Sequence, residues 1–512
     1  MNTTMPIPIV DLFAGPGGLG EGFSALNDGQ SFKIVVSAER DSFAYQTLRM
    51  RAYYRLVRRE NPELLADYYN FCNGLSDLPY SAQTISFWNE AGDEALQIEL
   101  GSEEGNERLD SAIKNHNITP DKPWLLIGGP PCQAYSLAGR SRNAGKADYN
   151  PADDDRHFLY EEYLRIIQKY KPAVFVMENV KGILSSRVDN KVIFHQILKD
   201  LASPDIALGL INPKHEYVIC SLVNDEQFKA GDDLTKLNSS NFVVKAEDYG
   251  IPQARHRVIL LGIRTDYFKK FEKLSSADRV SVSDVINDLP RLRSKLSKET
   301  DSSISWQQSV SAQLLSLASH SDDLLLQQQL IDTAKKVGNA ETSGALRFPK
   351  LQATDKPKLE DWFLDKKLDV WLNHETRGHM TSDLGRYGYA ASFAKINKRS
   401  PKGHTEFALP GLRPEHKNWE SGNFSDRFRV QLADNPATTI TSHISKDGHY
   451  FIHYDPTQCR SLTVREAARI QTFPDNYFFQ GNRTQQYHQV GNAVPPLLAN
   501  SIAAIVFEVL KK

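Results

Sequence analysis

One cysteine in this chain stands directly after a short apolar run, where a thiol could do chemistry. The residues at 125–136 read L-L-I-G-G-P-P-C-Q-A-Y-S. The apolar part is too short for a helix and predicts a buried strand, which the Gly-Gly-Pro-Pro run at 128–131 ends in a loop. Cys132 then falls at the carboxyl end of a strand, where open α/β sheets bind ligands. On this stretch alone, a nucleophilic thiolate and a buried structural cysteine are equally good interpretations.

A carboxyl group and two arginines accompany other predicted strands. Ala173–Met177 predicts a strand, and Glu178 comes directly after it, so its carboxyl group would share the edge that carries Cys132. A later Q-A-R-H-R segment leads into a further strand, and its Arg255 and Arg257 lie on one face if the segment is extended. A cationic neighbour favours the thiolate form of a cysteine, so these residue types together could support nucleophilic catalysis.

A glycine-rich turn follows the first predicted strand, at 7–13. The sequence A-G-P-G-G-L-G-E-G-F fits G-x-G-x-x-G and opens a predicted helix over 18–26. A second strand over 32–37 leads to Glu39, an acidic residue about 20 positions after the glycines, which suits a ribose hydroxyl pair. The pattern predicts an adenosine-type ligand without separating NAD from other adenosine cofactors. A plain glycine turn is the other interpretation.

These strands need a sheet to position them, and the first 270 residues supply its pattern. Strands and helices alternate there, which predicts an α/β class with a doubly wound parallel sheet. The alternation continues through predicted helices at 157–170 and 189–201 and predicted strands at 217–223 and 258–263. The polar loop after Cys132 is long for a compact domain and predicts a mobile lid or a binding loop.

The remaining segments have weaker patterns. The basic-aromatic helical stretch at 41–69 predicts a solvated helix face, with phosphate contact as the alternative, and the polar residues at 72–120 predict an insertion. Residues 275–340 are rich in Ser, Leu and Gln and predict helices. Residues 375–445 carry basic residues among glycines and aromatics, as in H-E-T-R-G-H-M, L-G-R-Y-G-Y-A and K-I-N-K-R-S-P-K-G-H, without clear periodicity. Such a composition suits a surface that meets phosphates and bases, although an irregular solvated domain would have it too.

Composition limits the class of protein. A chain of 512 residues predicts two or three domains. The net charge of -2 means that any nucleic-acid surface must be a local patch. The four cysteines form no C-x-x-C pair, so we expect no metal site and no disulfide scaffold, and a reducing cytoplasm as the location. We also expect no signal peptide and no membrane-spanning segment.

From the residues alone, a cysteine dehydrogenase that uses NAD stays open. No histidine accompanies Cys132 in a protease-like signature, and a Rossmann-type fold is wrong for papain-like chemistry.

The chain resembles a DNA (cytosine-5)-methyltransferase of the bacterial type. The matching segments occur in the family's order from Asp11 to Pro496, with a long variable region in the family's place, so the resemblance covers nearly the whole chain. They are D-L-F-A-G-P-G-G-L, Glu39, G-G-P-P-C-Q-A-Y-S, M-E-N-V, Q-A-R-H-R, R-S-L-T-V-R-E-A-A-R-I-Q-T-F-P-D and Q-V-G-N-A-V-P-P.

The resemblance implies a Rossmann-like sheet of the S-adenosylmethionine-dependent methyltransferases with a smaller, irregular target-recognition domain. It places the catalytic domain at 1–270, the recognition domain at 271–480 and a segment returning to the catalytic domain at 481–512. Within the recognition domain, Ser275–Tyr454 corresponds to the target-recognition segment, and Arg460–Asp475 would support its packing.

The resemblance also assigns the catalytic roles. Cys132 would add to C6 of a flipped-out cytosine so that C5 becomes nucleophilic and takes a methyl group from S-adenosylmethionine. Glu178 would hold N3 and the amino group, with its carboxyl protonated in a shielded pocket. Arg257, with Arg255, would place positive charge near the base and the thiolate. Asn179 would orient the loop, and the loop after the cysteine would close over the base.

The cofactor pocket is carried over in the same way. The residues that would bind S-adenosylmethionine are Phe13, Gly15, Pro16, Gly17, Glu39, Pro130, Leu159, Asn492 and Val494. The family also has an acidic residue before the cysteine strand that meets the adenine. Asp110 is a candidate for it, but the segment at 50–120 blurs this position, and we make no assignment.

The implied partner is double-stranded DNA, and we expect a monomer that acts in the cytoplasm. It would serve a restriction-modification system, with a cognate restriction endonuclease acting separately, or stand as an orphan methylase. One alternative is a tRNA cytosine-5 methyltransferase, which the long variable region disfavours. Two others are an NAD-dependent oxidoreductase that uses Cys132 and a catalytically silent DNA-binding module. The target sequence cannot be read from the chain.

Overall fold

The protein is described by a computed structural model. It describes residues 5–131, 158–188, 191–210, 215–338, 342–350, 356–414, 419 and 427–511. Cys132 and the polar loop that follows it lie outside the described residues, so their predicted roles are not addressed by the structure.

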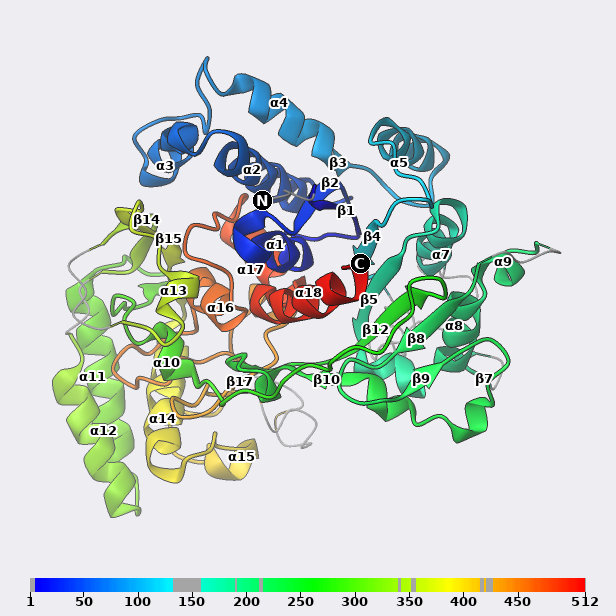
Figure 1. Cartoon of the computed structure of the whole chain (residues 1–512). Helices are drawn as coiled ribbons and strands as arrows, with labels where there is room; N and C mark the ends of the chain where they lie inside the picture. The colour runs from blue at the N-terminus through cyan, green and yellow to red at the C-terminus, as the bar shows by residue number, and fades with distance from the viewer. Residues whose placement is uncertain are drawn as a thin grey trace.

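A nine-stranded sheet forms the centre of the first half of the chain (Figure 1). Its strands lie in the order β3-β2-β1-β4-β5-β12-β8-β9, with β10 paired to β12. Their bounds are β1 Ile7–Leu12, β2 Phe32–Glu39, β3 Ala95–Gln97, β4 Leu125–Gly128, β5 Val174–Val180, β8 Tyr217–Cys220, β9 Gln227–Phe228, β10 Val243–Lys245 and β12 His256–Arg264. The α/β class predicted from the alternating pattern is confirmed.

Strand direction departs from the prediction on one side of the sheet. Strands β3, β2, β1, β4 and β5 are parallel, but β12 runs antiparallel to both of its neighbours, β5 and β8. The predicted parallel sheet is therefore mainly parallel, with β12 as an antiparallel member. The reversal matters for the site, because it brings the start of β12, and not its end, to the edge where β4 and β5 end.

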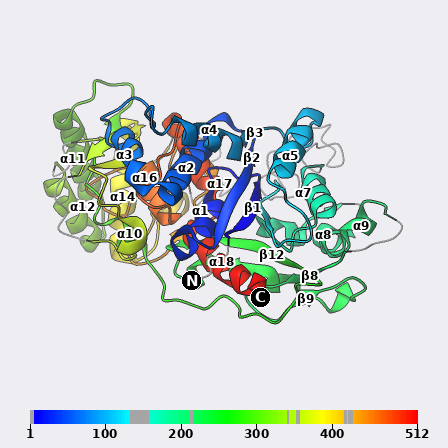
Figure 2. The same ribbon diagram turned by 45° about the horizontal axis from the view of Figure 1, so that its top comes forward.

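Two apolar cores cover the two faces of the sheet (Figures 1 and 2). One core packs α1 (Gly18–Ala25) and α18 (Pro496–Leu510) against the sheet. The other packs α5 (Glu103–Asn115), α7 (Phe158–Tyr170) and α8 (Ile193–Ala202) against the opposite face. The C-terminal helix thus closes the core that the first helix begins.

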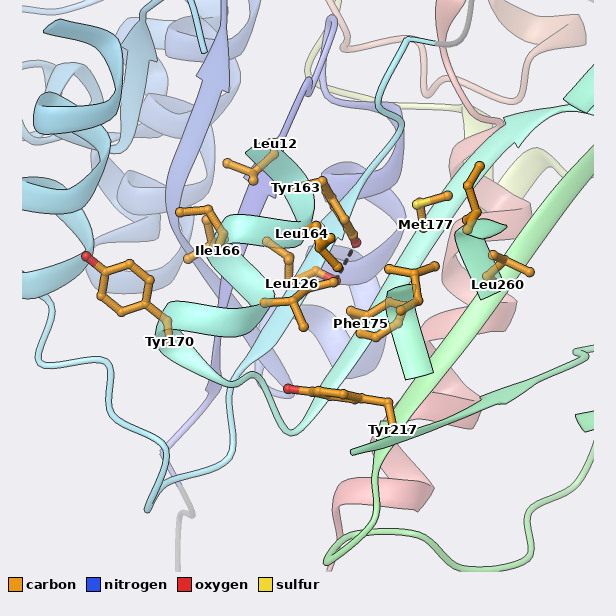
Figure 3. Close-up of a cluster of buried hydrophobic side chains, with 14 of the residues drawn as sticks. Leu12, Leu126, Tyr163, Leu164, Ile166, Tyr170, Phe175, Met177, Tyr217 and Leu260 are labelled. Carbon is orange, nitrogen blue, oxygen red and sulfur yellow. Dashed lines mark hydrogen bonds between the residues drawn. The ribbon is translucent and has the colours of Figure 1, made fainter. Parts of the chain in front are cut away.

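Tyr163 of α7 ties its helix to the sheet in the second of these cores (Figure 3). Its hydroxyl donates to the carbonyl oxygen of Val176 at 3.0 Å, so the polar end of a buried ring is satisfied inside the apolar layer. Its ring meets Phe175 edge-on, with centroids 6.3 Å apart. Fully burying one such apolar side chain stabilises the fold by about 1.5–3 kcal/mol.

The basic-aromatic stretch at 41–69 is not the solvated face that we predicted. It forms α2 (Ser42–Glu60), a turn, and the start of α3 (Ala66–Asn73). Arg51 is only 3% exposed, and its guanidinium contacts the buried Glu21 carboxylate at 2.5 Å. The prediction was wrong because the compensating carboxylate comes from α1, which the local pattern of α2 does not reveal.

The residues at 72–120 are also more than an insertion. They contain α4 (Ile85–Glu94), the edge strand β3 and α5, which continue the strand-helix alternation of the sheet.

The second half of the chain contains helices and short paired strands. The elements before α18 are α10 Val282–Ile286, β13 Lys295–Leu296, α11 Ser303–Ser319, α12 Leu324–Lys336, β14 Gly344–Pro349, α13 Glu360–Phe363, β15 Val370–Glu375, β16 Gly378–His379, α14 Thr381–Asn397, α15 Gly403–Glu406, β17 Ala437–Thr438, η9 Ser442–Ser445, α16 Val464–Ile470 and α17 Arg483–Asn492. The predicted helices at 275–340 are confirmed. The 375–445 region is more regular than expected, because L-G-R-Y-G-Y-A lies inside α14.

Burial also revises the predicted basic surface of this region. His374, His379, Arg386 and Tyr387, from the first two of the three cited segments, are buried. The third segment keeps several basic side chains exposed, namely Lys395, Lys398, Arg399, Lys402 and His404. Only this third segment therefore fits the expected surface.

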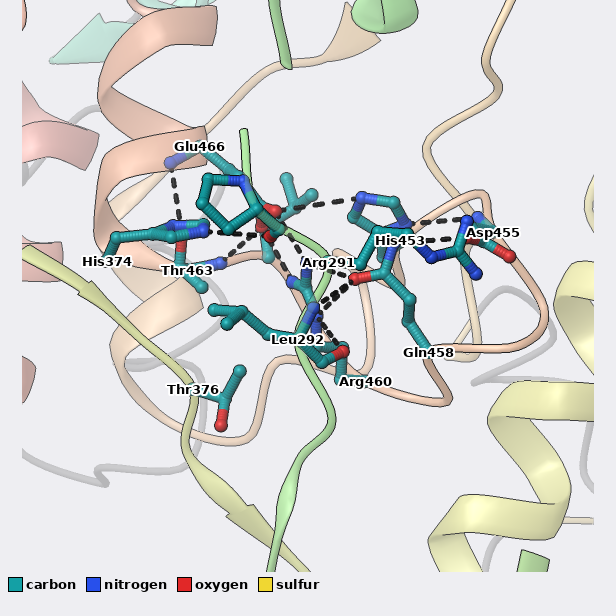
Figure 4. A network of polar contacts seen from close by, with 12 residues as sticks. Arg291, Leu292, His374, Thr376, His453, Asp455, Gln458, Arg460, Thr463 and Glu466 are labelled. Carbon is teal, nitrogen blue, oxygen red and sulfur yellow. Dashed lines mark hydrogen bonds and ion pairs between the residues drawn. The ribbon is translucent and has the colours of Figure 1, made fainter. Parts of the chain in front are cut away.

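A buried polar network surrounds the start of α16 (Figure 4). The Glu466 carboxylate accepts from Arg460 at 2.6 and 2.8 Å and completes a capping box with Thr463. His374 and His453 lie beside it, and burial lowers the pKa of each to about 4. Both imidazoles are therefore neutral at pH 7.

One apolar stretch in the described part of the chain, Arg483–Leu510, is long and apolar enough to cross a membrane, contrary to our expectation that none is. It consists of α17 and α18, and 61% of its most apolar window is buried inside the protein. The packing of α18 against the sheet accounts for this composition as that of a core helix.

The depressed histidine pKa values predict a pH-dependent stability. Between about pH 4 and 6.5 the unfolded chain binds protons that folded His453 does not, so this residue's contribution grows with pH and is fully present above 6.5. Over this pH range, His453 changes the free energy of unfolding by about 3 kcal/mol. We expect His453→Gln to reduce the rise in unfolding free energy between pH 4.5 and 6.5, measured by urea titration. His320→Gln, at an exposed position, is the control; an unchanged slope in His453→Gln would contradict the assignment.

Candidate functional site

The site begins where β1 and β4 end side by side, next to Met177 inside the longer strand β5. Leu12 of β1 pairs with Gly128 of β4, and Gly128 pairs with Met177 of β5. The segments that follow these strands therefore leave the sheet at one edge. The chain turns from β1 toward β2 on one side and adds β4 and β5 on the other, and such a reversal of strand order is where open α/β sheets bind ligands.

Glu178 and Arg257 meet at this edge. The antiparallel register of β12 places Ile259 opposite Glu178, so Arg257 reaches back over the end of β5. Its Nε lies 2.9 Å from Glu178 Oε1, an ion pair whose angle is not that of a hydrogen bond, and both side chains are only partly exposed. A Cβ added at Gly129 would lie 3.1 Å from Glu178 Oε2, so glycine leaves that oxygen room.

Asn179 fastens the segment that leads toward Cys132. Its Nδ2 donates to the carbonyl oxygen of buried Pro130 at 3.1 Å, and its Oδ1 accepts from the N–H of Val180. The contact holds the end of β4 against the end of β5. The loop that Asn179 was predicted to orient lies outside the described residues.

Arg255 is placed differently from Arg257. Its Nη1 donates to the carbonyl oxygens of Ile440 at 2.9 Å and Gly491 at 3.3 Å, and the side chain is 3% exposed. Burial and the neighbouring Arg257 lower its pKa, while Glu178 opposes the shift. Its charge lies near the site, but its hydrogen bonds in the described structure join the residue before β12 to the second half of the chain.

Several residues of the glycine turn after β1 have left-handed backbone conformations. Phe13, Gly15 and Gly17 have φ values of 56°, 58° and 95°, and this conformation favours glycine. A Cβ added at Gly15 would meet nothing within 4 Å, so the turn borders open space. The Tyr477 hydroxyl donates to the carbonyl oxygen of Pro16 and anchors the turn from the far end of the chain.

Glu39 closes the same turn from the end of β2. Its carboxylate accepts from the N–H groups of Gly15, Arg40 and Asp41 at 2.8, 2.9 and 2.8 Å. Burial raises the pKa of Glu39, and these three donors oppose the shift. A carboxylate offers about four acceptor positions, so one remains for a ligand hydroxyl. A prepositioned acceptor beside open glycine backbone fits the ribose of an adenosine-type cofactor.

The remaining predicted cofactor residues lie on three other parts of the chain: the start of α7, the end of α17 and the segment before α18. A Cβ on Gly101, just beyond β3, would lie 3.7 Å from Leu159 at the start of α7. Asn492 ends α17 and is exposed. The carbonyl oxygen of Val494 would lie 2.2 Å from a Cβ on Gly18, so the return segment is in direct contact with the start of α1.

Sequence reasoning missed two features of the site. The end of β3 lies beside Glu39, which pairs with Gln97, and three residues of such a short strand left no clear periodic signal. Asp110 of α5, the candidate to which we made no assignment, forms ion pairs with Arg165 and Lys169 of α7. Asp11 of β1 is buried with no hydrogen-bond partner on either oxygen in the described structure, and burial raises its pKa to about 8.

Comparisons with known proteins agree with this geometry. The model of a family described as C-5 cytosine-specific DNA methylase matches residues 101–205 and 236–508. Type II methyltransferase M.Bpa9945I of Bacillus paralicheniformis is 32% identical over 98% of this chain and 99% of its own length. DNA (cytosine-5-)-methyltransferase M.ApeKI of Aeropyrum pernix is 25% identical, covering 75% of this chain and 81% of its own.

One solved structure supports the fold as a whole. It is a prophage-encoded protein of E. coli described as a DNA modification methyltransferase, with a TM-score of 0.54 and 18% identity, and the match covers 99% of this chain and 100% of that one.

The contact between Gly18 and Val494 gives a steric prediction. Alanine at an open helical position stabilises a protein by up to about 1 kcal/mol relative to glycine. At Gly18, however, the alanine Cβ would collide with the Val494 carbonyl. We expect Gly18→Ala to destabilise the protein by roughly 1–3 kcal/mol, measured as a loss of thermal stability. Gly92→Ala in α4, where the nearest neighbour is the flexible Arg49 side chain, is the control. A Gly18→Ala protein as stable as the parent would refute this packing.

Proposed function

Because the chain belongs to the C-5 cytosine-specific DNA methylase family, we propose that it methylates C5 of a flipped-out cytosine in a specific duplex DNA sequence. The methyl group comes from S-adenosylmethionine, and the reaction passes through a covalent adduct with Cys132. The observation that carries this proposal is the meeting of Glu178 and Arg257 at the edge to which β4 leads the cysteine segment.

Cys132 activates the base in this proposal. Cytosine C5 is a poor nucleophile, and addition of the thiolate to C6 moves electron density onto C5. Glu178 hydrogen-bonds N3 and the amino group, and a proton relayed through its carboxyl group to N3 neutralises the charge that develops there. After C5 has taken the methyl group, its proton passes to solvent water, the C5–H electron pair forms the C5–C6 double bond and the C6–S bond breaks. The aromatic ring is restored and the thiolate is released.

Arg257 and Asn179 hold the other parts of this constellation. Arg257 keeps the Glu178 carboxyl at one position, 2.9 Å from its Nε, and supplies positive charge beside the base. Asn179 fixes the Pro130 carbonyl, so the chain leaves β4 in one direction toward the nucleophile. Arg255, the residue before β12, contributes charge from a buried position.

S-adenosylmethionine supplies an electrophilic methyl group when it is bound. In the proposed pocket, Glu39 accepts from a ribose hydroxyl, and the open backbone at Gly15 allows close approach. Phe13, Pro16 and Gly17 continue that wall, and Pro130 flanks it. Leu159, Asn492 and Val494 complete the boundary of the pocket.

Duplex DNA is the proposed partner, bound by the region from Ser275 to Tyr454. A base inside a duplex is out of reach of the thiol and must be extruded. Exposed Lys395, Lys398 and Lys402 near α14 and α15 supply charge suited to phosphates. The type II names of the relatives favour a restriction-modification role, with any endonuclease acting separately. We propose the cytoplasm as the place of action. We propose a monomer as the active form.

Methyl transfer from tritiated S-adenosylmethionine tests the substrate class. We expect label in duplex DNA and none in tRNA, and bisulfite sequencing of DNA from expressing cells then reveals the target sequence. Cys132→Ala should abolish the transfer and retain DNA binding. Label in tRNA alone would refute the DNA proposal, and full turnover by Cys132→Ala would refute the nucleophile.

A further inference from the structure

Two buried glutamines join the recognition half of the chain to the segment behind the cofactor turn. Gln253 forms β11 (Gln253–Ala254), which pairs with β17, and it is fully buried. Its Oε1 accepts from the N–H of Ile440 at 2.7 Å, and its Nε2 donates to Oε1 of Gln471 at 2.9 Å. Gln471, also fully buried, follows α16.

Gln471 extends the hydrogen-bonded chain to the return segment. Its Nε2 donates to the carbonyl oxygens of Val490 at 2.7 Å and Ala493 at 3.2 Å. The orientation of both amides is fixed by their partners, since the Ile440 N–H can only donate and the two carbonyls can only accept. Neither glutamine can rotate without leaving a buried polar group unsatisfied.

The two ends of this chain of contacts touch different parts of the proposed site. Ile440 lies two residues before η9, where His443 and the following Lys446 are exposed. Ala493 immediately precedes Val494, whose carbonyl packs against Gly18 below the cofactor turn.

A second set of contacts runs parallel to the glutamines. Arg255 donates to the carbonyls of Ile440 and Gly491. A Cβ on Gly491 would lie 2.3 Å from the N atom of Ser442, so α17 and η9 are packed backbone to backbone. A displacement of the Ile440 segment must therefore be transmitted to the end of α17 or break buried hydrogen bonds.

We propose that the Gln253–Gln471 pair is a positioning element that couples duplex binding by the recognition half to cofactor binding at the glycine turn. The inference rests on the proposed function. Coupling of this kind is reciprocal, so DNA raises cofactor affinity by the factor by which cofactor raises DNA affinity. Gln471 is not among the residues proposed to bind DNA or cofactor, and it acts through the Val490–Val494 backbone.

The test measures binding instead of turnover. The dissociation constant of S-adenosylhomocysteine is determined by calorimetry with and without a duplex carrying the sequence found by bisulfite sequencing. We expect the unaltered chain to bind S-adenosylhomocysteine at least about fivefold tighter with DNA. Gln471→Met, which keeps the side-chain length and removes the amide, should bring that ratio close to one while changing each separate affinity by less than about threefold.

Gln486→Met is the matched control. Gln486 is likewise a buried glutamine, and its Nε2 donates to a backbone carbonyl at 2.7 Å, but it does not contact Gln253 or Gln471. It should lose similar thermal stability and retain the coupling. If Gln471→Met does not fold, Gln253→Met replaces it with the same expectation.

Three results would overturn the inference: no coupling in the unaltered chain, coupling retained in the Gln471 or Gln253 variant, or equal loss in the Gln486 control. Absence of DNA methylation by the unaltered chain would instead refute the proposed function, which separates the two failures.

Discussion

The register between β1, β4 and β5 is the constraint on which the site depends. Because Leu12, Gly128 and Met177 lie side by side, the glycine turn and the chain toward Cys132 leave the sheet beside Glu178, the next residue of β5. The antiparallel direction of β12 adds Arg257 to that edge from the opposite sense. A slip of one residue in β5 would turn Glu178 to the other face of the sheet and separate it from Arg257.

The second half of the chain completes the first through buried polar contacts. Tyr477 holds the turn at Pro16, and α18 fills the apolar face beside α1. Arg465 donates to the carbonyls of Leu372 and Tyr477, so α16 supports β15 and the return path together. Buried charges of this kind are costly to leave unpaired, which explains why the segments that carry them must fold as one unit.

Much of the fold and of the site followed from the sequence where local pattern and chemistry agree. The first strand, the glycine turn and Glu39 lie where they were predicted, because an apolar run, glycines and an acid each impose their own local geometry. The direction of β12 could not be predicted, since strand order and direction depend on long-range pairing. Helix α14 was missed because it is buried on nearly every side, which removes the amphipathic period.

The central claim is that Cys132 bonds to the cytosine ring while Glu178 and Arg257 hold the base. A duplex with 5-fluorocytosine at the methylated position tests it directly, because fluorine cannot leave C5 as a proton does and the adduct is trapped after methyl transfer. With S-adenosylmethionine present, the account predicts a denaturation-resistant protein–DNA complex that maps to Cys132 by peptide mass spectrometry and is absent in Cys132→Ser. A crosslink at another residue, or methylation of ordinary duplex with no trapped complex, would contradict it.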